Sequence, residues 1–231
     1  MFIAAAGMFG IFLFLTYYLQ LTLGYSPLVT GVTFLPISGC LILMANLSTI
    51  VLMPRFGPKP LVASGMLAAS GGALWLAQLG PHTAYATGVL GPLILAGIGL
   101  GMVIAPVINT GTFGVASQDA GVASATVTVG QMLGGSIGTS LLNTIFAAAV
   151  TSYITAHLAS ARLIGRQALA GLALAHGYDT AFWWIAGIFA GGAVVGGVLL
   201  RRGPLGQNRT PSPARGGVVT AQAKEGGERV R

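Results

Sequence analysis

Charged residues are almost missing from this sequence. Asp, Glu, Lys and Arg make up 6% of its 231 residues, against about 25% in an ordinary soluble domain. Hydrophobic residues reach 54%, so a soluble globular fold is excluded. Transmembrane β-strands are excluded too, because the sequence lacks their repeated ten-residue alternation and open strands leave backbone groups unpaired in lipid. The composition therefore predicts an all-α polytopic membrane protein.

Cysteine is also scarce, and Cys40 is the only one in the chain. A single cysteine excludes an intrachain disulfide, and its place in an apolar run indicates a small buried side chain. Met1 leads directly into roughly twenty apolar residues without the basic segment that opens a secretory signal. We therefore expect the first segment to be a membrane span.

Metal-binding and nucleotide-binding patterns are missing as well. The three histidines, His82, His157 and His176, are scattered along the chain and form no HExxH motif. The sequence also lacks the Gly-rich Lys-Ser/Thr loop that binds nucleotides. It therefore predicts no enzyme, no cofactor and no metal site. Acidic and basic residues are absent from the apolar windows, which predicts that this chain alone does not relay protons.

Six apolar windows are long enough to cross a bilayer core, which takes roughly 20 helical residues. They cover about 3–23, 28–53, 60–79, 85–107, 122–150 and 180–200. Short turn sequences such as GYSP and GPHT separate neighbouring windows, so adjacent spans are expected to run antiparallel. The longer connection, 151–179, is predicted to be an extracytoplasmic loop with a short interfacial helix.

The few basic residues predict the orientation. Arg55 and Lys59 are the only formal charges among the first 118 residues, and cytoplasmic loops collect such residues. Six spans then place both termini in the cytoplasm, including a basic tail at 203–231 whose composition predicts disorder. This gathering of charge favours a multi-pass protein of the cell membrane over a nucleic-acid partner.

Polar residues and glycines distinguish the predicted spans. Polar side chains concentrate in the first, second, fourth and fifth spans, which we expect to be inner helices, whereas the third and sixth are expected to face lipid. The alternative for Asn46, Asn109 and Asn143 is interhelical hydrogen bonding worth about 0.6 to 2 kcal/mol each. Glycines at spacing four indicate close helix packing. These packing glycines are Gly97, Gly101, Gly130, Gly134 and Gly138.

Four segments together resemble a known family. They are YLQLTLGYSPLVTGVTFLP (18–36), PRFGPK (54–59), LILAGIGLGMVIAP (93–106) and DAGVASATVTVGQMLGGSIGTSLLNTIF (119–146). In this order they resemble the C-terminal six spans of fourteen-span drug:proton antiporters of the major facilitator superfamily, from Met1 to about Arg202. The resemblance implies a half bundle built as a 3+3 inverted repeat. It also implies efflux of drugs or amphipathic natural products by alternating access.

The resemblance also implies a partner and candidate sites. The N-terminal six-span half supplies the missing wall of the cavity and the acidic residues that couple protons. On this chain, aromatic and amide groups suit amphipathic substrates, so the candidates for the cavity are Phe14, Tyr17, Asn46, Asn109 and Gln131. Arg55, Gly57 and Lys59 match the superfamily's cytoplasmic loop motif, although Pro54 replaces its Asp and Ile50 its first Gly.

Two questions stay open at this point. If the resemblance holds, Met1 begins in the middle of a transporter, so the chain is a fragment, a mis-called start, or a split half that pairs with another chain. The competing function is a membrane scaffold without transport, a six-span bundle that associates through its glycine strips.

Overall fold

The computed structural model describes residues 1–80, 83, 85–112, 115, 118–158 and 165–199, and nearly all of them are helical. The predicted tail at 203–231 lies outside these residues. The elements are α1 (Phe2–Tyr17), the π-helical turn η1 (Tyr18–Thr22), α2 (Pro27–Thr33), α3 (Leu35–Leu47), η2 (Ser48–Leu52), α4 (Met53–Phe56), α5 (Pro58–Leu76), η3 (Tyr85–Val89), α6 (Leu90–Thr112), α7 (Ala120–Ala156) and α9 (Arg166–Leu199).

Each predicted span coincides with a helical stretch. Within the described ranges, five stretches are long and apolar enough to cross a membrane, judged by length and composition. They are Phe2–Thr22, Pro27–Phe56, Leu90–Gly111, Ala120–Ala156 and Arg166–Val198. The remaining predicted span, the third at 60–79, corresponds to α5, which is not among them although it has 19 residues. Its glycines, serines and first-turn Lys59 lower its hydropathy.

The connection predicted at 151–179 is corrected by the structure. Helix α7 continues to Ala156 and α9 already begins at Arg166, so most of the expected loop belongs to two long helices. The apolar residues that suggested a short interfacial helix form the first turns of α9 instead. Helix α7 has 37 residues, about 55 Å at 1.5 Å per residue, so it exceeds a bilayer core of about 30 Å.

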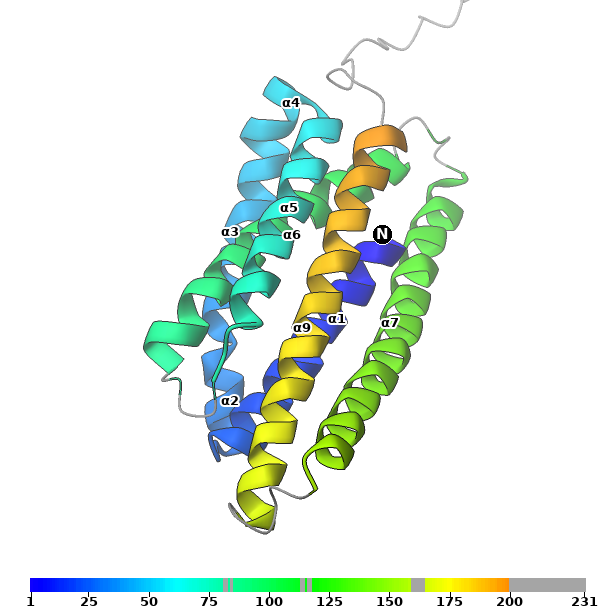
Figure 1. Cartoon of the computed structure of the whole chain (residues 1–231). Helices are drawn as coiled ribbons and strands as arrows, with labels where there is room; N and C mark the ends of the chain where they lie inside the picture. The colour runs from blue at the N-terminus through cyan, green and yellow to red at the C-terminus, as the bar shows by residue number, and fades with distance from the viewer. Residues whose placement is uncertain (81–82, 84, 113–114, 116–117, 159–164, 200–231) are drawn as a thin grey trace, which may run out of the picture.

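The helices pack as two pairs joined by a central pair. Helix α3 packs on α6, and α1 packs on α7, while α5 and α9 pack on each other between those pairs. Figure 1 shows α7 along one side of α9, with α3, α5 and α6 on the other. The third and sixth spans are therefore central in this chain, whereas the prediction placed them at the periphery. Small residues in α5 allow this, because they let α6 and α9 approach closely.

The packing follows a repeat of three helices. Exchanging α1, α3 and α5 for α6, α7 and α9 converts the α3–α6 contact into α7–α1 and the α5–α6 contact into α9–α1. The α5–α9 contact maps onto itself. Because neighbouring spans alternate in direction, the two triplets run in opposite senses, as an inverted repeat requires. The exchange is incomplete, since α7 packs along α9 while α3 makes no comparable contact with α5 among the described residues.

The two ends of the bundle differ in chemistry. Figure 1 shows α2 and the last turn of α7 at one end of the bundle, and α4, which carries Arg55, at the other. The α2 end holds Tyr18 of η1, Tyr85 of η3 and Tyr153 of α7, and we call it the tyrosine end. At the tyrosine end the hydroxyl of Tyr85 donates to the Thr33 carbonyl at 2.8 Å, which joins η3 to α2. Nearby, Ser26 caps α2 by accepting from the Val29 amide at 3.4 Å.

Candidate functional site

Of the five cavity candidates from the sequence, Phe14 and Tyr17 lie together on α1, and the three amides lie on α3, α6 and α7. Phe14 is fully buried, with its ring 5.3 Å from the ring of Phe146 on α7. Tyr17 meets Phe14 edge to face at 6.2 Å and is half-buried. Both rings therefore belong to the packing between α1 and α7 in this conformation. Their role toward a substrate stays a prediction.

The three amide candidates lie on three different helices. Asn46 of α3 is exposed and donates to the Ile42 carbonyl of its own helix at 2.8 Å. Asn109 of α6 is half-buried, with its Nδ2 atom 3.9 Å from the sulfur of Met53. Gln131 is half-buried on α7. A wall made by these amides would need a further element opposite them.

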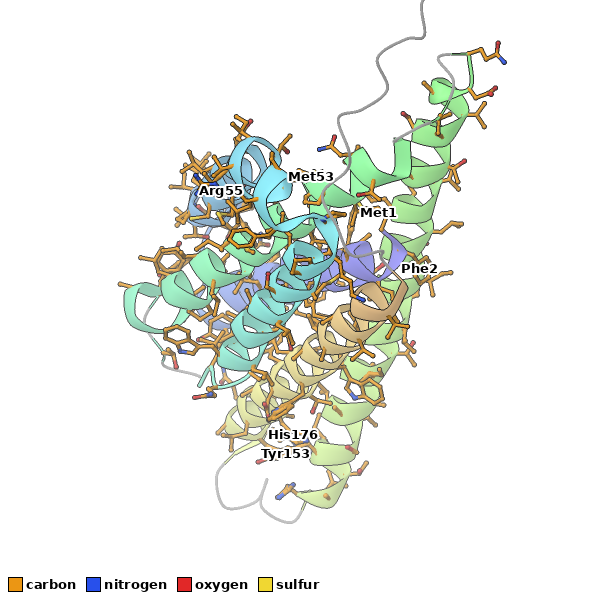
Figure 2. All side chains as sticks on the ribbon, turned by 90° about the horizontal axis from the view of Figure 1, so that it is seen from above. Met1, Phe2, Met53, Arg55, Tyr153 and His176 are labelled. Atoms are coloured by element: carbon orange, nitrogen blue, oxygen red, sulfur yellow. The ribbon has the colours of Figure 1, made fainter. Side chains whose placement is uncertain are left out.

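The basic motif forms the sharp turn between α4 and α5. Gly57 adopts φ 77° and ψ 171°, a region that is essentially restricted to glycine. Its amide donates to the Met53 carbonyl at 3.0 Å and closes α4, and Pro58 opens α5. Arg55 is exposed at this turn, beside Met53 in Figure 2, and Lys59 is half-buried. The backbone thus explains Gly57 independently of the superfamily motif.

The packing glycines of α6 face α3. A Cβ atom at Gly97 would lie 2.7 Å from the Ile37 carbonyl oxygen, and one at Gly101 would lie 2.6 Å from that of Leu41. Such separations are shorter than real contacts, so only glycine permits this approach of α3 and α6.

Of the three packing glycines on α7, two contact another helix and one faces open space. A Cβ atom at Gly138 would lie 2.6 Å from the Ala6 Cα atom, and one at Gly134 would collide with the Phe2 backbone, so both glycines seat α1. Gly130 has no atom within 4 Å of such a Cβ atom. The glycine spacing alone therefore predicted a packing contact one helical turn longer than the contact between α7 and α1 in the structure.

Two contacts between α5 and α6 were not predicted. A Cβ atom at Gly65 would lie 2.7 Å from the Gly99 carbonyl, and one at Gly99 would lie 2.5 Å from the Gly65 carbonyl. These residues lie on different helices, so no local spacing relates them. Their glycine-rich surroundings were the only available signal.

Residues 134–138 read GGSIG, letters that fit the Gly-x-Ser-x-Gly pattern of a nucleophile elbow. That elbow requires a sharp turn from a strand into a helix. Ser136 instead lies in the middle of α7, so these letters do not form an elbow. Within the described residues, moreover, no three His, Cys, Asp or Glu side chains gather as metal ligands would.

A shallow, open surface region, which we call the hollow, lies along the exposed face of α7. It is lined by Asn143, Thr144, Ala147, Ala148, Thr151 and Ser152. The hydroxyl of Thr144 donates to the Ser140 carbonyl at 3.0 Å, and that of Ser152 to the Ala149 carbonyl at 3.0 Å. Their oxygen lone pairs remain available, so this surface offers hydrogen-bond acceptors together with the exposed amide of Asn143.

Aromatic side chains join α1, α7 and α9 at the tyrosine end. Tyr178 of α9 contacts the rings of Phe146 at 5.2 Å and Tyr18 at 5.8 Å. The hydroxyl of Tyr18 donates to the Gly80 carbonyl at 2.9 Å, beyond the end of α5. This aromatic cluster therefore holds together elements from both halves of the repeat.

A second ring group lies nearer the tip of the tyrosine end. Tyr153 stacks on His157 with ring centroids 4.3 Å apart and meets His176 of α9 at 5.2 Å (Figure 2). His157 Nδ1 lies 2.9 Å from the Tyr153 carbonyl, which can only accept, so Nδ1 carries the proton. The group fastens the last turn of α7 to α9.

The known proteins that this chain resembles are resistance, export and transport proteins. No family model matches the chain. It is 39% identical over 196 residues to the puromycin resistance protein Pur8 of Streptomyces alboniger, which covers 84% of this chain and 38% of that protein. It is 35% identical over 161 residues to the cephamycin export protein CmcT of Amycolatopsis lactamdurans, covering 69% of this chain and 33% of CmcT.

A third relative is the MFS-type transporter EfpA of Mycobacterium tuberculosis, which is 28% identical over 200 residues, or 86% of this chain and 36% of EfpA. The chain thus spans about a third of the length of these relatives. Over most of its own length, the chain is therefore similar to part of a resistance protein, part of an antibiotic export protein and part of an MFS-type transporter.

Proposed function

We propose that the chain forms one half bundle of an efflux transporter that exports amphipathic drugs or natural products by alternating access. The observation that carries the proposal is the uneven burial of the helices. In the apolar 18-residue window of Pro27–Phe56 only 11% is buried, and in that of Ala120–Ala156 only 28%, against 56% in that of Phe2–Thr22. Helices α3 and α7 therefore offer faces for a second bundle.

The polar residues on the exposed face of α7 indicate that this face lies against protein or water. Asn143, Ser136 and Ser140 lie there among apolar residues. Amide groups are costly against hydrocarbon, and irregular polar surface within a membrane is placed against protein or a water-filled cavity. The hollow around Asn143 accordingly lines the substrate path in the proposed transporter.

The partner in this proposal is an N-terminal bundle of six spans. It covers α3 and α7, completes the wall for Asn46, Asn109 and Gln131, and supplies the acidic groups for proton coupling. The protein then lies in the cell membrane with the Arg55 end in the cytoplasm and the tyrosine end outside. Substrates are amphipathic because the available wall combines aliphatic side chains with hydroxyl and amide groups.

Export assays test the proposal. The native reading frame that contains this chain is expressed in a drug-sensitive bacterium, and efflux of puromycin and cephamycin, the compounds in two relatives' names, is measured. Thr144→Val and Asn143→Leu are expected to lower export several-fold. Thr126→Val is the matched control, because Thr126 is exposed on the same helix, bonds its own backbone at 2.9 Å and lies outside the hollow.

Normal membrane insertion without export of either compound, or of a wider panel of amphipathic drugs, would contradict the proposed function and favour the scaffold. If Thr126→Val and Thr144→Val lowered export equally, the hollow would not be part of the substrate path. The proposal that the protein exports drugs would still stand.

A further inference from the structure

The three tryptophans of the chain lie exposed at one level of the bundle. Trp75 on α5 is 47% exposed, and Trp183 and Trp184 on α9 are 60% and 53% exposed. Helices α5 and α9 run antiparallel, and the Ser70 hydroxyl bonds the Ala186 carbonyl between them. From that bond, Trp75 lies about 7 Å and Trp184 about 3 Å along the axis toward the tyrosine end. The three indoles therefore share a level to within about one helical turn.

The exposed surface of α5 and α9 changes its chemistry at this level. Between the tryptophans and the Arg55 end, the exposed large hydrophobic side chains of these two helices are Leu67, Val194, Val195 and Val198. Toward the tyrosine end, the exposed residues of α9 include Arg166, Gln167, Leu172 and His176. A surface that passes from aliphatic groups through indoles to charged and amide groups matches the passage from hydrocarbon through lipid headgroups to water.

The length of α5 agrees with this boundary. Lys59 in its first turn and Trp75 near its end are about 24 Å apart along the helix axis. A lysine side chain can extend toward the headgroups, which adds a few ångströms. The stretch between the two residues therefore matches a hydrocarbon core of about 30 Å. Lysine and tryptophan are also the residues that anchor the ends of a membrane helix at the interfaces.

We propose that Trp75, Trp183 and Trp184 bind the boundary between headgroups and acyl chains in one leaflet of the membrane. Their rings lie over the acyl chains, and their N–H groups donate to oxygen atoms of the phospholipid. The exposed faces of α5 and α9 between these residues and the Arg55 end contact lipid, whereas the exposed faces of α3 and α7 remain for the second bundle.

The same boundary places two helix ends in water. Helix α9 begins at Arg166, about 27 Å before Trp184 along the axis. Figure 1 shows its first turns, together with the last turns of α7, reaching past the end of α5. Tyr153 of α7 and His176 of α9 join these two segments, with ring centroids 5.2 Å apart. The last turns of α7 and the first turns of α9 therefore stand side by side outside the bilayer.

The hollow on α7 then lies at the edge of the bilayer. A Cβ atom at Gly10 would lie 2.6 Å from Leu142 of α7 and 3.1 Å from Ile185 of α9, so Leu142 lies at the level of the tryptophans. The hollow begins at Asn143 and continues to Ser152, toward the tyrosine end. One consequence rests on the proposed function, namely that a substrate which follows the hollow leaves it among lipid headgroups. The depth of the tryptophans is measured without transport, so the two proposals can fail separately.

Fluorescence quenching by brominated lipid measures this depth. The protein is expressed from its native reading frame with one of the three tryptophans retained and every other tryptophan replaced by Phe. It is reconstituted in vesicles of phosphatidylcholine that carries bromine either near the headgroup or near the ends of the acyl chains. We expect each retained tryptophan to be quenched several-fold more strongly by bromine near the headgroup.

Two matched positions calibrate the measurement in a background without the native tryptophans. Leu67→Trp, at a position 59% exposed on α5 and about 12 Å deeper than Trp75, is expected to respond most to bromine near the chain ends. Leu172→Trp, at a position 42% exposed on α9 and about 18 Å beyond Trp184, is expected to be quenched by acrylamide in the water and by neither lipid.

The boundary would be overturned if bromine near the chain ends quenched the native tryptophans more strongly, because the indoles would then lie deep in the core. It would also be overturned if neither lipid quenched them while Leu67→Trp responded, because protein would then cover this face. Quenching of Leu172→Trp by lipid as strongly as Trp184 would refute the placement of the two helix ends in water.

Discussion

At the scale of single residues, long-range contacts decide the role of each side chain. Phe14 was expected to line a cavity because it is aromatic and lies in a polar-containing span. Its partner Phe146 is 132 positions away on α7, and no local pattern in the sequence encodes that contact. Asn46 and Thr144, by contrast, bond carbonyls four residues earlier, which their positions within helices explain.

Ser70 shows what a single buried hydroxyl contributes. Its Oγ atom donates to the Ala186 carbonyl at 2.9 Å and so bonds α5 to α9 at the centre of the bundle. We expect Ser70→Ala to lower the free energy of unfolding by about 0.6 to 1.7 kcal/mol, the range for such bonds in membrane proteins. Unfolding of the purified protein in mixed detergent micelles measures this change.

Ser64→Ala serves as the control for that measurement. Ser64 lies on the same helix, but its hydroxyl donates to the Leu61 carbonyl of α5 itself at 3.2 Å. Its removal is expected to change stability little. If the two variants were equally stable, the Ser70 bond would contribute nothing to the packing of α5 on α9.

At the scale of helices, the sequence predicts well that a helix is present, but it predicts poorly where that helix begins and ends. Apolar runs of about 20 residues located all six helical stretches, because burial in a membrane requires that length. The prediction ended this span at Val150, where the apolar window ends, whereas the rings of Tyr153 and His176 hold the following turn of α7 against α9. The π-helical turns had no sequence signal at all.

Alanine substitutions at two glycines of α7 distinguish the effect of helix packing on stability from the effect of helix propensity. Gly138→Ala places a methyl group against the Ala6 backbone, so α1 and α7 must move apart; we expect a loss of about 1 to 3 kcal/mol, as for other overpacked sites. Gly130→Ala meets open space, and alanine favours a helix over glycine by up to about 1 kcal/mol. Chemical unfolding of both variants, compared with the parent, measures the difference.

Equal stability of the two alanine variants would show that α1 and α7 do not approach as closely as described. A loss confined to Gly130→Ala would indicate instead that a second bundle packs on that part of α7.

At the scale of the whole molecule, the order in which the helices pack could not be predicted from the sequence. Counting polar residues ranked the first, second, fourth and fifth spans as inner helices, yet α5 and α9 occupy the centre of this chain. Polarity indicates which helices face a cavity or a second bundle, and it does not report which helices are surrounded by the other helices of this chain. Repeat symmetry in the contacts, by contrast, agrees with the expected 3+3 arrangement.

The orientation of the bundle is testable with two cysteines in a Cys40→Ala background. Leu28→Cys, near the tyrosine end, is expected to react with an impermeant maleimide in intact cells. Phe56→Cys, which is exposed beside Arg55, is expected to react only after permeabilisation. Replacing Arg55 and Lys59 together by Gln is expected to produce mixed orientations, because these cations direct the loop inward. The opposite labelling pattern would invert the topology proposed above.

Helix α7 is long, and the place where α1 touches it has a mechanical consequence. Gly138, seated on Ala6, is the midpoint of Ala120–Ala156, so roughly 27 Å of helix extends to each side of this contact. Because Tyr153 and His176 join the last turn of α7 to α9, a tilt of about 10° around Gly138 would carry that tip and the start of α9 together by roughly 5 Å, and the other tip as far in the opposite direction. Leverage of this kind widens one mouth of a transporter as it narrows the other.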